Sequence, residues 1–373
     1  MSNQPGFKPP PYPYDRLDDL KPLADHHEGG IVDCSIGTPI DPPPDRVVEA
    51  LASSGMERSY PPSIGTLAFR EKVAEWMLDS FGCNIDPLSQ IAAAVGTKEF
   101  VAGLPHWMKL RSPDRDTVLY PSVSYPSYEM GAILAGCRAV AVPVDENWSI
   151  RLDEVSDEDR SRALLLWVNT PGNPAGGLDD LDAVAHWGRS NQIPVFSDEC
   201  YCEFTWDGSP RTILSSGTQG VVSVHSLSKR SNLAGVRVGF YAGDSEVVDY
   251  LREVRKHAGF MVPGPAQAAA VAALTDQAHV ERQRDIYWNR LNRLSKLVSN
   301  LGAEASLPQG GFYLWVPAPG GDAWGFVEQL LTEIGLLASP GEFYGSRGAG
   351  YVRIAAVQTD DRIKLLEQRL GMS

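Results

Sequence analysis

A lysine near the middle of the chain stands where an amine could attack a carbonyl carbon. Lys229 follows the apolar run 221–224, in the stretch Ser226-Leu-Ser-Lys-Arg-Ser-Asn-Leu-Ala-Gly-Val-Arg237. Burial beside such a strand disfavours the charged ammonium, lowers the lysine pKa and leaves more free amine for condensation with an aldehyde. The hydroxyls of Ser226 and Ser228 and the guanidinium of Arg237 could hold a phosphate nearby. Together these groups indicate a phosphorylated aldehyde such as pyridoxal phosphate.

The same stretch resembles a known family signature. The lysine signature of the class I and II pyridoxal-phosphate aminotransferases of fold type I is matched, position by position, by Ser226, Ser228, Lys229, Leu233, Gly235, Arg237 and Gly239. The resemblance runs from about Gly30 to the C-terminus and implies that Lys229 binds pyridoxal 5'-phosphate. Ser226 and Lys229 also spell the S-x-x-K of β-lactamases and penicillin-binding proteins, but no Ser-Asp-Asn or Lys-Thr-Gly follows.

Two further apolar runs also end in polar residues. The run 163–168 precedes Asn169-Thr-Pro-Gly-Asn173, and the run 194–196 precedes Ser197-Asp198-Glu-Cys-Tyr201. Ligands of open α/β sheets gather beyond the carboxyl ends of strands, so we expect these side chains near Lys229. The resemblance implies that Asp198 keeps the pyridine nitrogen protonated and that Tyr201 and Asn173 donate to the phenolic oxygen. It makes Lys229, Asp198 and Tyr201 catalytic; without it, Asp198 could cap a helix or pair with a cation, and Asn173 and Tyr201 could be structural.

A second phosphate-binding element is predicted at Val95-Gly-Thr97-Lys98-Glu-Phe100. A glycine turn that opens a helix offers free N–H groups to an anion. The resemblance implies that the amides of Thr97 and Lys98 join the Ser226 hydroxyl and Arg237 around the phosphate. Without the resemblance, the segment is a plain start of a helix.

Two tyrosines are assigned by the resemblance alone. Tyr125, in Tyr120-Pro-Ser-Val-Ser-Tyr-Pro, matches the aromatic residue that stacks on the pyridine face. Tyr60 matches the residue that reaches the phosphate of the neighbouring subunit, which implies a homodimer.

Substrate recognition is expected from Arg353, Asn173 and Gly37. Arg353, in Tyr351-Val-Arg-Ile-Ala, resembles the family arginine that binds the substrate α-carboxylate, and a guanidinium matches a carboxylate with two parallel hydrogen bonds. The alternative is an exposed arginine on an edge strand. Gly37 and the segment 311–315 match parts that close over the substrate. The chain departs from the family at Asn173-Pro-Ala-Gly176, where the usual Asn-Pro-Thr-Gly has a threonine.

The elements that must position these residues predict an α/β fold. Six short apolar runs, at 118–120, 139–144, 163–168, 194–196, 221–224 and 236–242, alternate with helix-like stretches such as 67–81. This pattern predicts a mostly parallel central sheet covered by helices. Helices at 267–274 and 278–301, followed by strands at 311–316 and 351–356 around a helix at 324–334, predict a smaller α+β domain. The proline- and glycine-rich residues up to 44 read as an arm and loop.

The resemblance also implies the domain organisation. It assigns the N-terminal arm to the smaller domain. We therefore expect residues 45–274 to form the large cofactor-binding domain, and residues 1–44 and 275–373 the small one.

Bulk properties exclude several classes of protein. The 373 residues carry a net charge of −14, which repels nucleic acid and anionic membranes. Five cysteines without C-x-x-C spacing fit neither a disulfide framework nor a zinc site, so we expect no metal. The N-terminus has no apolar segment of a secretory signal. We therefore expect a soluble, cytoplasmic enzyme that acts on small amino and 2-oxo acids.

The reaction is the least determined part of the prediction. Segments such as His225-Ser-Leu-Ser-Lys229 and Gly341-Glu-Phe-Tyr-Gly345 resemble the actinobacterial N-succinyldiaminopimelate aminotransferases of lysine biosynthesis. That resemblance implies amino transfer from glutamate to a succinylated keto acid. Aspartate or aromatic aminotransferases and cystathionine-cleaving C–S lyases remain alternatives, because fold and cofactor do not fix the bond that is broken. A catalytically inactive binding module is disfavoured because the predicted catalytic residues are all present.

Overall fold

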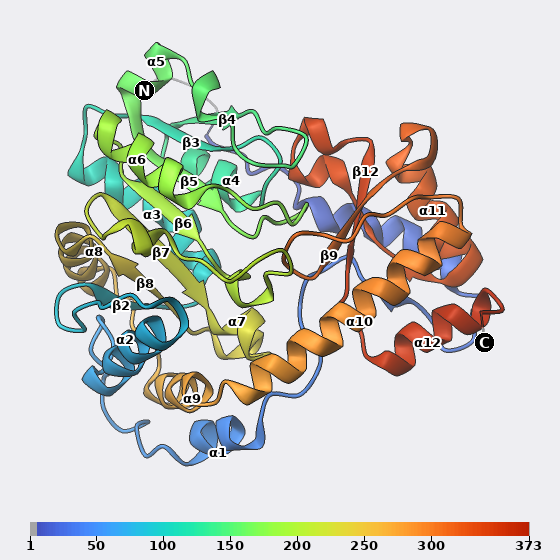
Figure 1. Ribbon diagram of the computed structural model, residues 1–373, viewed down its shortest axis with the longest axis horizontal. Coiled ribbons are helices and arrows are strands. Elements are labelled where there is room, and N and C mark those ends of the chain that lie inside the picture. The colour runs from blue at the N-terminus through green and yellow to red at the C-terminus, as the bar shows by residue number, and fades with distance from the viewer. Residues whose placement is uncertain (1–5, 373) are drawn as a thin grey trace.

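The larger part of the molecule is built around one seven-stranded sheet (Figure 1). The computed structural model describes residues 6–372. The strands lie in the order β2-β8-β7-β6-β5-β3-β4. Their bounds are β2 Ile91–Ala94, β3 Thr117–Pro121, β4 Arg138–Val142, β5 Ala163–Asn169, β6 Val195–Asp198, β7 Val221–Ser226 and β8 Gly239–Gly243. Strand β8 is antiparallel to β2 and β7, and the other neighbours are parallel, so the predicted mostly parallel sheet is confirmed.

Helices cover both faces of this sheet. One face packs against α2 (Leu67–Phe81), α6 (Leu181–Asn191) and α9 (Gly264–Leu274). The other packs against α3 (Thr97–Arg111), α4 (Ser127–Leu134) and α8 (Ser245–His257). Successive strand residues alternate between the two cores, as Ile91 and Ala93 do with Ala92 and Ala94. A strand buried on both faces is apolar at every position, which explains the continuous runs in the sequence.

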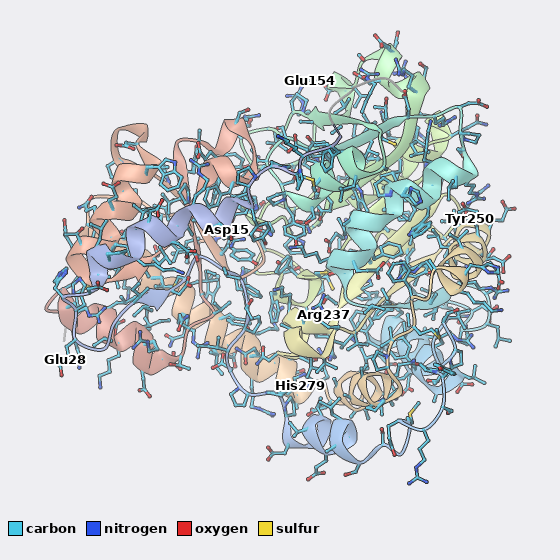
Figure 2. The ribbon with its side chains drawn as sticks, turned by 180° about the vertical axis from the view of Figure 1, so that it is seen from behind. Asp15, Glu28, Glu154, Arg237, Tyr250 and His279 are labelled. Atoms are coloured by element: carbon cyan, nitrogen blue, oxygen red, sulfur yellow. The ribbon has the colours of Figure 1, made fainter. Side chains whose placement is uncertain are left out.

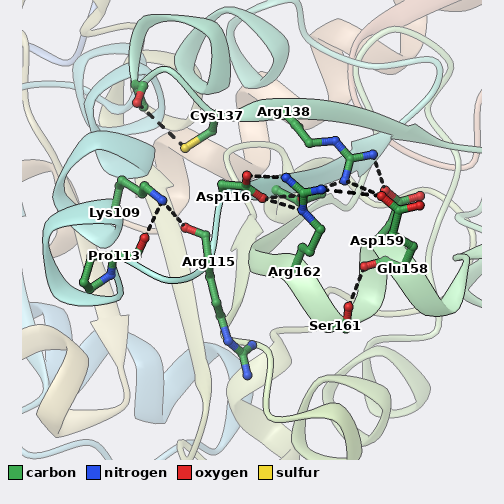
Figure 3. Close-up of polar contacts among 12 residues, drawn as sticks. Lys109, Pro113, Arg115, Asp116, Cys137, Arg138, Glu158, Asp159, Ser161 and Arg162 are labelled. Atoms are coloured by element: carbon green, nitrogen blue, oxygen red, sulfur yellow. Dashed lines mark hydrogen bonds and ion pairs between the residues drawn. The ribbon is translucent and has the colours of Figure 1, made fainter.

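Ion pairs tie the amino-terminal edge of the sheet together (Figure 3). Asp116, just before β3, accepts a hydrogen bond of 2.9 Å from Nε of Arg162 in α5 (Asp157–Arg162). Arg138, the first residue of β4, donates to Asp159 at 2.9 Å. The carboxyl ends of the parallel strands therefore lie at the opposite edge.

A smaller part of the molecule contains two short sheets. Strands β11 (Ser339–Pro340), β12 (Tyr351–Ala355) and β9 (Tyr313–Pro317) form an antiparallel sheet in that order. Strand β1 (Val32–Asp33) pairs in parallel with β10 (Leu336–Leu337). Helices α11 (Ala323–Ile334) and α12 (Asp360–Arg369) pack beside them. The helix α10 (Ala278–Asn300) runs from the neighbourhood of α9 into this part, as Figure 1 shows.

The N-terminal segment is more ordered than its composition predicts. Residues Pro13–Ala24 form a 3-10 helix packed against α11, where we expected an arm and loop. The helix α1 (Asp45–Ser53) packs against α9. One apolar core unites the smaller part with Val123, Val144 and Phe204 of the larger part. The domain boundaries at 44/45 and 274/275 therefore stay a prediction.

Residues 6–372 contain neither a membrane-spanning helix nor a cluster of metal ligands. None of the described helices is both long enough and apolar enough to cross a membrane. No group of three or more His, Cys, Asp or Glu side chains within this range could hold a metal ion. The five cysteines are all free thiols.

Candidate active site

Strands β5, β6 and β7 are neighbours and end side by side. Asn169, at the end of β5, pairs in register with Asp198, at the end of β6. Strand β7 ends at Ser226 and leads into the short helix α7 (Leu227–Arg230), which carries Lys229. The Ser226 hydroxyl accepts the Ser228 N–H at 3.1 Å and so caps the start of α7. The sheet thus places an amide, a carboxylate and an amine along one edge.

A cavity of about 490 Å³ opens at this edge. Apart from Tyr60, every predicted site residue lines it: Gly37, Thr97, Lys98, Tyr125, Asn173, Asp198, Tyr201, Ser226, Lys229, Arg237 and Arg353. Tyr60 is 93% exposed and lies outside the cavity of the single chain. Gly37 and Arg353 belong to the smaller part, so the cavity lies where the two parts meet.

The Lys229 side chain is half-buried, and its amine donates to the carbonyl of Gly37. Burial is the main cause that lowers the pKa of Lys229 to about 8; the positive charges of Arg353 and Arg237 contribute to the shift, and Cys200 opposes it. An amine with this pKa is partly unprotonated near neutral pH and can react with an aldehyde.

Asp198 is a buried carboxylate with 6% exposure. Burial raises its pKa, and hydrogen bonds to the carboxylate oppose that rise. The Tyr128 hydroxyl donates to Oδ2 at 2.8 Å, and the Cys200 N–H donates to Oδ1 at 3.2 Å. Within residues 6–372 no lysine, arginine or histidine forms an ion pair with Asp198. A cation in the cavity would therefore meet a carboxylate that is already oriented.

Anion-binding groups gather beside α3. Gly96, with φ +73°, turns the chain into α3, and Thr97 is the first residue of that helix. A Cβ atom at position 96 would overlap the Arg237 guanidinium, so the glycine lets this cation approach the helix N-terminus. Arg237 lies near the middle of the molecule, where the two parts meet (Figure 2). The free N–H groups of α3, the arginine and the Ser226 hydroxyl suit a phosphate group.

Arg353 is fully enclosed in the smaller part. It lies in β12, the central strand of its sheet, and is 2% exposed, so the alternative of an exposed edge-strand arginine is wrong. Its guanidinium carbon lies 4.3 Å and 4.7 Å from the ring centroids of Tyr313 and Tyr344. It donates to Asn173 Oδ1 at 2.8 Å and to the Ser35 carbonyl. Its Nε atom is buried and has no hydrogen-bond partner in the described part of the chain.

Three further predicted residues complete the wall. The hydroxyls of Tyr201 and Tyr313 lie 2.9 Å apart. The Asn173 N–H donates to Asn169 Oδ1 at 2.8 Å, which fixes the loop between them. Tyr125 lines the cavity and packs edge-on against Tyr128, with ring centroids 5.9 Å apart.

Sequence reasoning missed several residues of this site. Tyr12 and Tyr14 line the cavity, and the Tyr12 hydroxyl accepts a hydrogen bond of 3.3 Å from Lys98 Nζ. Tyr128 holds Asp198, although it does not line the cavity. The alternating proline and tyrosine at positions 11–14 are a local pattern that could mark this wall of the cavity. The Tyr128–Asp198 contact joins residues 70 positions apart and leaves no local pattern.

The residues fit pyridoxal phosphate by their chemistry. The cavity offers an amine for the aldehyde, a buried carboxylate that has no cationic partner among the described residues for the pyridine nitrogen, and an anion site at a helix N-terminus for the phosphate. The unpaired Nε of Arg353 leaves a donor for a further anion.

Comparisons with known proteins agree with this geometry. Residues 30–370 match the family model described as aminotransferase class I and II. The chain is 40% identical to a 4-dedimethylamino-4-oxo-anhydrotetracycline transaminase of Streptomyces rimosus, over 97% of this chain and 99% of that protein. It is 39% identical to a probable aminotransferase of Mycobacterium tuberculosis, over 97% of this chain and 85% of the relative. A solved structure of a probable N-succinyldiaminopimelate aminotransferase from Thermus thermophilus superposes with a TM-score of 0.85 at 28% identity, covering 96% of this chain and 100% of the other.

Proposed function

The chain belongs to the class I and II aminotransferase family, and we propose that it exchanges an amino group between glutamate or 2-oxoglutarate and a second amino or 2-oxo acid. The observation that carries this proposal is the meeting of Lys229, Asp198 and Arg353 in one cavity. The family implies pyridoxal phosphate as the cofactor. When bound, it supplies an aldehyde that condenses with amines and a ring that withdraws electrons from the substrate Cα.

Lys229 is the residue we assign to the covalent bond and to proton transfer. Its amine, with a pKa of about 8, can hold the aldehyde carbon and then give way to the substrate amine. Once free, the same amine would lie at the reacting centre, where it could take the proton from the substrate Cα and deliver it to the former aldehyde carbon of the cofactor, two bonds away. The Gly37 carbonyl, which accepts a hydrogen bond from this amine, holds it in place.

We assign Asp198 to the pyridine ring of the cofactor and Arg353 to the carboxylate of the substrate. The Asp198 carboxylate, oriented by Tyr128, would hold a proton on the pyridine nitrogen, with Tyr201 and Asn173 as donors to the phenolic oxygen. Arg353 would bind the substrate α-carboxylate, because it has a rigid guanidinium and an unused buried Nε. We assign phosphate binding to Thr97, Lys98, Ser226 and Arg237. Tyr125 would stack on the pyridine face.

The test uses the visible spectrum of protein loaded with pyridoxal phosphate. Glutamate alone should convert the cofactor band to that of the amino form and release 2-oxoglutarate, and a 2-oxo acid should reverse the change. Lys229→Ala should abolish both changes. A loaded wild-type protein whose spectrum responds to none of the twenty common amino acids would contradict the proposal.

For the second substrate we propose the N-succinylated keto acid precursor of LL-2,6-diaminopimelate. The sequence resemblance and the Thermus thermophilus structure support it. A second candidate is a polycyclic ketone of the kind named for the Streptomyces rimosus relative, favoured by the 40% identity and by the tyrosines at positions 12, 14 and 125 in the cavity wall. An acceptor panel with both compounds, aspartate and aromatic 2-oxo acids decides between them. Release of ammonia and pyruvate from cystathionine without an acceptor would instead support a C–S lyase.

We further propose that two chains form a homodimer in which Tyr60 reaches the neighbouring phosphate site. The 93% exposure of Tyr60 in the single chain supports this role. The five free thiols support a location in the reducing cytoplasm.

A further inference from the structure

Two loops meet at the amine of Lys229. One loop follows Cys34, carries Gly37 and ends at Asp41; the other is the connection after β7, which contains the short helix α7 with Lys229 and then Asn232. They touch at the cavity, where the Lys229 amine donates to the Gly37 carbonyl. A Cβ atom at position 37 would overlap the Tyr313 hydroxyl, so the first loop has no room to shift toward Tyr313.

The same two loops are joined a second time, behind the cavity, through helix α10. The Tyr287 hydroxyl donates to Asn232 Oδ1 at 3.4 Å, Asn232 Nδ2 donates to Gln283 Oε1 at 3.1 Å, and Gln283 Nε2 donates to Asp41 Oδ2 at 2.9 Å. An ionised carboxylate only accepts, so Asp41 fixes the direction of every bond in the series. We call Asn232, Gln283 and Asp41 the loop brace.

The loop brace is anchored to a rigid base. Arg290 is 2% exposed and binds Asp41 with both terminal nitrogens, at 2.6 Å and 2.9 Å. Gln283 is 6% exposed, and Tyr287 is fully buried. Asn232 has φ +56°, a conformation that a non-glycine residue holds only where its surroundings determine it.

We propose that Gln283 and Asp41 are positioning residues that set the separation of Gly37 from Lys229 and hence the fit of the substrate between them. The contact at the amine and the loop brace together form a closed ring. Lys229 is linked to Asn232 along the chain, and Asn232 is linked to Asp41 through Gln283. Asp41 is linked along the chain to Gly37, which contacts the Lys229 amine. Without the brace, the hydrogen bond at the amine is the one that still joins the two loops within residues 6–372, and it must be given up when the amine reacts. The role in substrate fit depends on the proposed aminotransferase function, whereas the effect on loop order does not.

The first test replaces Gln283 by methionine, which has a similar size but makes neither hydrogen bond. Hydrogen exchange of the Thr38 amide, which donates to the Ile36 carbonyl at 2.8 Å, should be about tenfold faster in the Gln283→Met protein than in the wild type, and kcat/KM for glutamate should fall about tenfold through a raised KM. The matched control is Gln90→Met. Gln90 also bridges two loops, to Thr218 at 2.9 Å and to the Gly243 carbonyl at 3.2 Å, but lies far from the cavity beside β2. The Gln90→Met variant should keep the exchange rate and kcat/KM within twofold of the wild type.

The second test inverts donor and acceptor. Asp41→Asn alone turns an amide N–H₂ group toward a donor of Gln283 or of Arg290, because both Asp41 oxygens accept from these residues. Gln283→Glu alone places two carboxylates together, so each single variant should reproduce the methionine effect. In the double variant the carboxylate at position 283 can accept from both Asn232 and the new amide at position 41, while that amide's oxygen keeps the bond from Arg290 Nη2 and the bond from Arg290 Nη1 is lost. The double variant should therefore recover at least half of the lost protection and of kcat/KM, which a general loss of stability would not do.

The outcomes separate the two proposals. Wild-type exchange and wild-type kcat/KM in Gln283→Met, or single variants that the double variant fails to rescue, would overturn the positioning role. A wild-type protein without transaminase activity would overturn the proposed function, and the exchange measurements would still decide whether the brace orders the loop.

Discussion

Lys229 in cofactor-free protein is expected to titrate near pH 8, about 2.5 pH units below an ordinary lysine. Burial removes water from the ammonium group, Arg353 and Arg237 add repulsion, and together they bring its pKa from 10.5 to about 8. At pH 7 about one molecule in ten then carries a free amine, against about one in three thousand for a lysine of pKa 10.5. The amine that must meet the aldehyde is therefore enriched about 300-fold.

The assay is competitive labelling of cofactor-free protein with a limiting amount of an acylating reagent between pH 6 and pH 10.5. Digestion and mass spectrometry give a separate rate for each lysine. The Lys229 rate should rise with a midpoint near pH 8, and Lys256, which is 64% exposed, gives the reference curve in the same digest. In Arg353→Met the midpoint should move upward, because the arginine charge lowers the pKa. Superimposed curves for the two lysines, or an unmoved midpoint in the variant, would refute the reasoning.

The lowered pKa of Lys229 also determines whether the free energy of unfolding rises or falls with pH. Between pH 8 and pH 10.5 the unfolded chain binds a proton at Lys229 that the folded chain has lost. The contribution of Lys229 to the free energy of unfolding therefore rises with pH through that window. Lys229→Met should remove this contribution, which chemical unfolding of cofactor-free protein at pH 7.5 and pH 10 would detect.

Three further substitutions test the other site residues. Asp198→Ala should retain part of the bound cofactor but lower kcat at least about 100-fold, because electron withdrawal loses its counter-charge; absorbance and turnover on one sample check this, and near-normal turnover would contradict it. Arg353→Lys should raise the KM for glutamate about 10- to 150-fold, since it loses one charge-assisted hydrogen bond of about 1.5–3 kcal/mol. An unchanged KM in steady-state kinetics would show that Arg353 does not bind the substrate carboxylate. Tyr128→Phe keeps the ring stacked on Trp167 but loses the 2.8 Å bond to Asp198. It should lower kcat about tenfold and the free energy of unfolding by about 1 kcal/mol, and wild-type values in both measurements would show that Tyr128 does not orient Asp198.

The sheet and its carboxyl edge could be predicted because they depend on local patterns. A parallel strand covered on both faces is a continuous apolar run, and β5, β6 and β7 each end in a polar residue at the point where the run stops. The sequence does not predict strand β2, because Ile91–Ala94 contains three alanines, which favour helix. The antiparallel direction of β8 depends on its neighbouring strands and cannot be predicted from the residues of β8 alone.

The parts of the site that could not be predicted depend on tertiary contacts. The Tyr128 bond to Asp198 and the seat of Arg353 between Tyr313 and Tyr344 bring together distant segments. The prolines of the N-terminal 3-10 helix break the helical pattern and predict a loop, yet packing against α11 stabilises the helix. Such contacts override local propensity, so the sequence alone leaves them open.

Helix α10 has a mechanical consequence for any motion between the two parts. Its 23 residues form one unbroken rod, about 34 Å long at 1.5 Å per residue. Its first turn contacts the larger part, where His279 Nε2 lies 3.0 Å from Ser231 Oγ, and its other end lies in the smaller part. The rod works as a lever, so a tilt of about 5° at its first turn would swing the far end through about 3 Å.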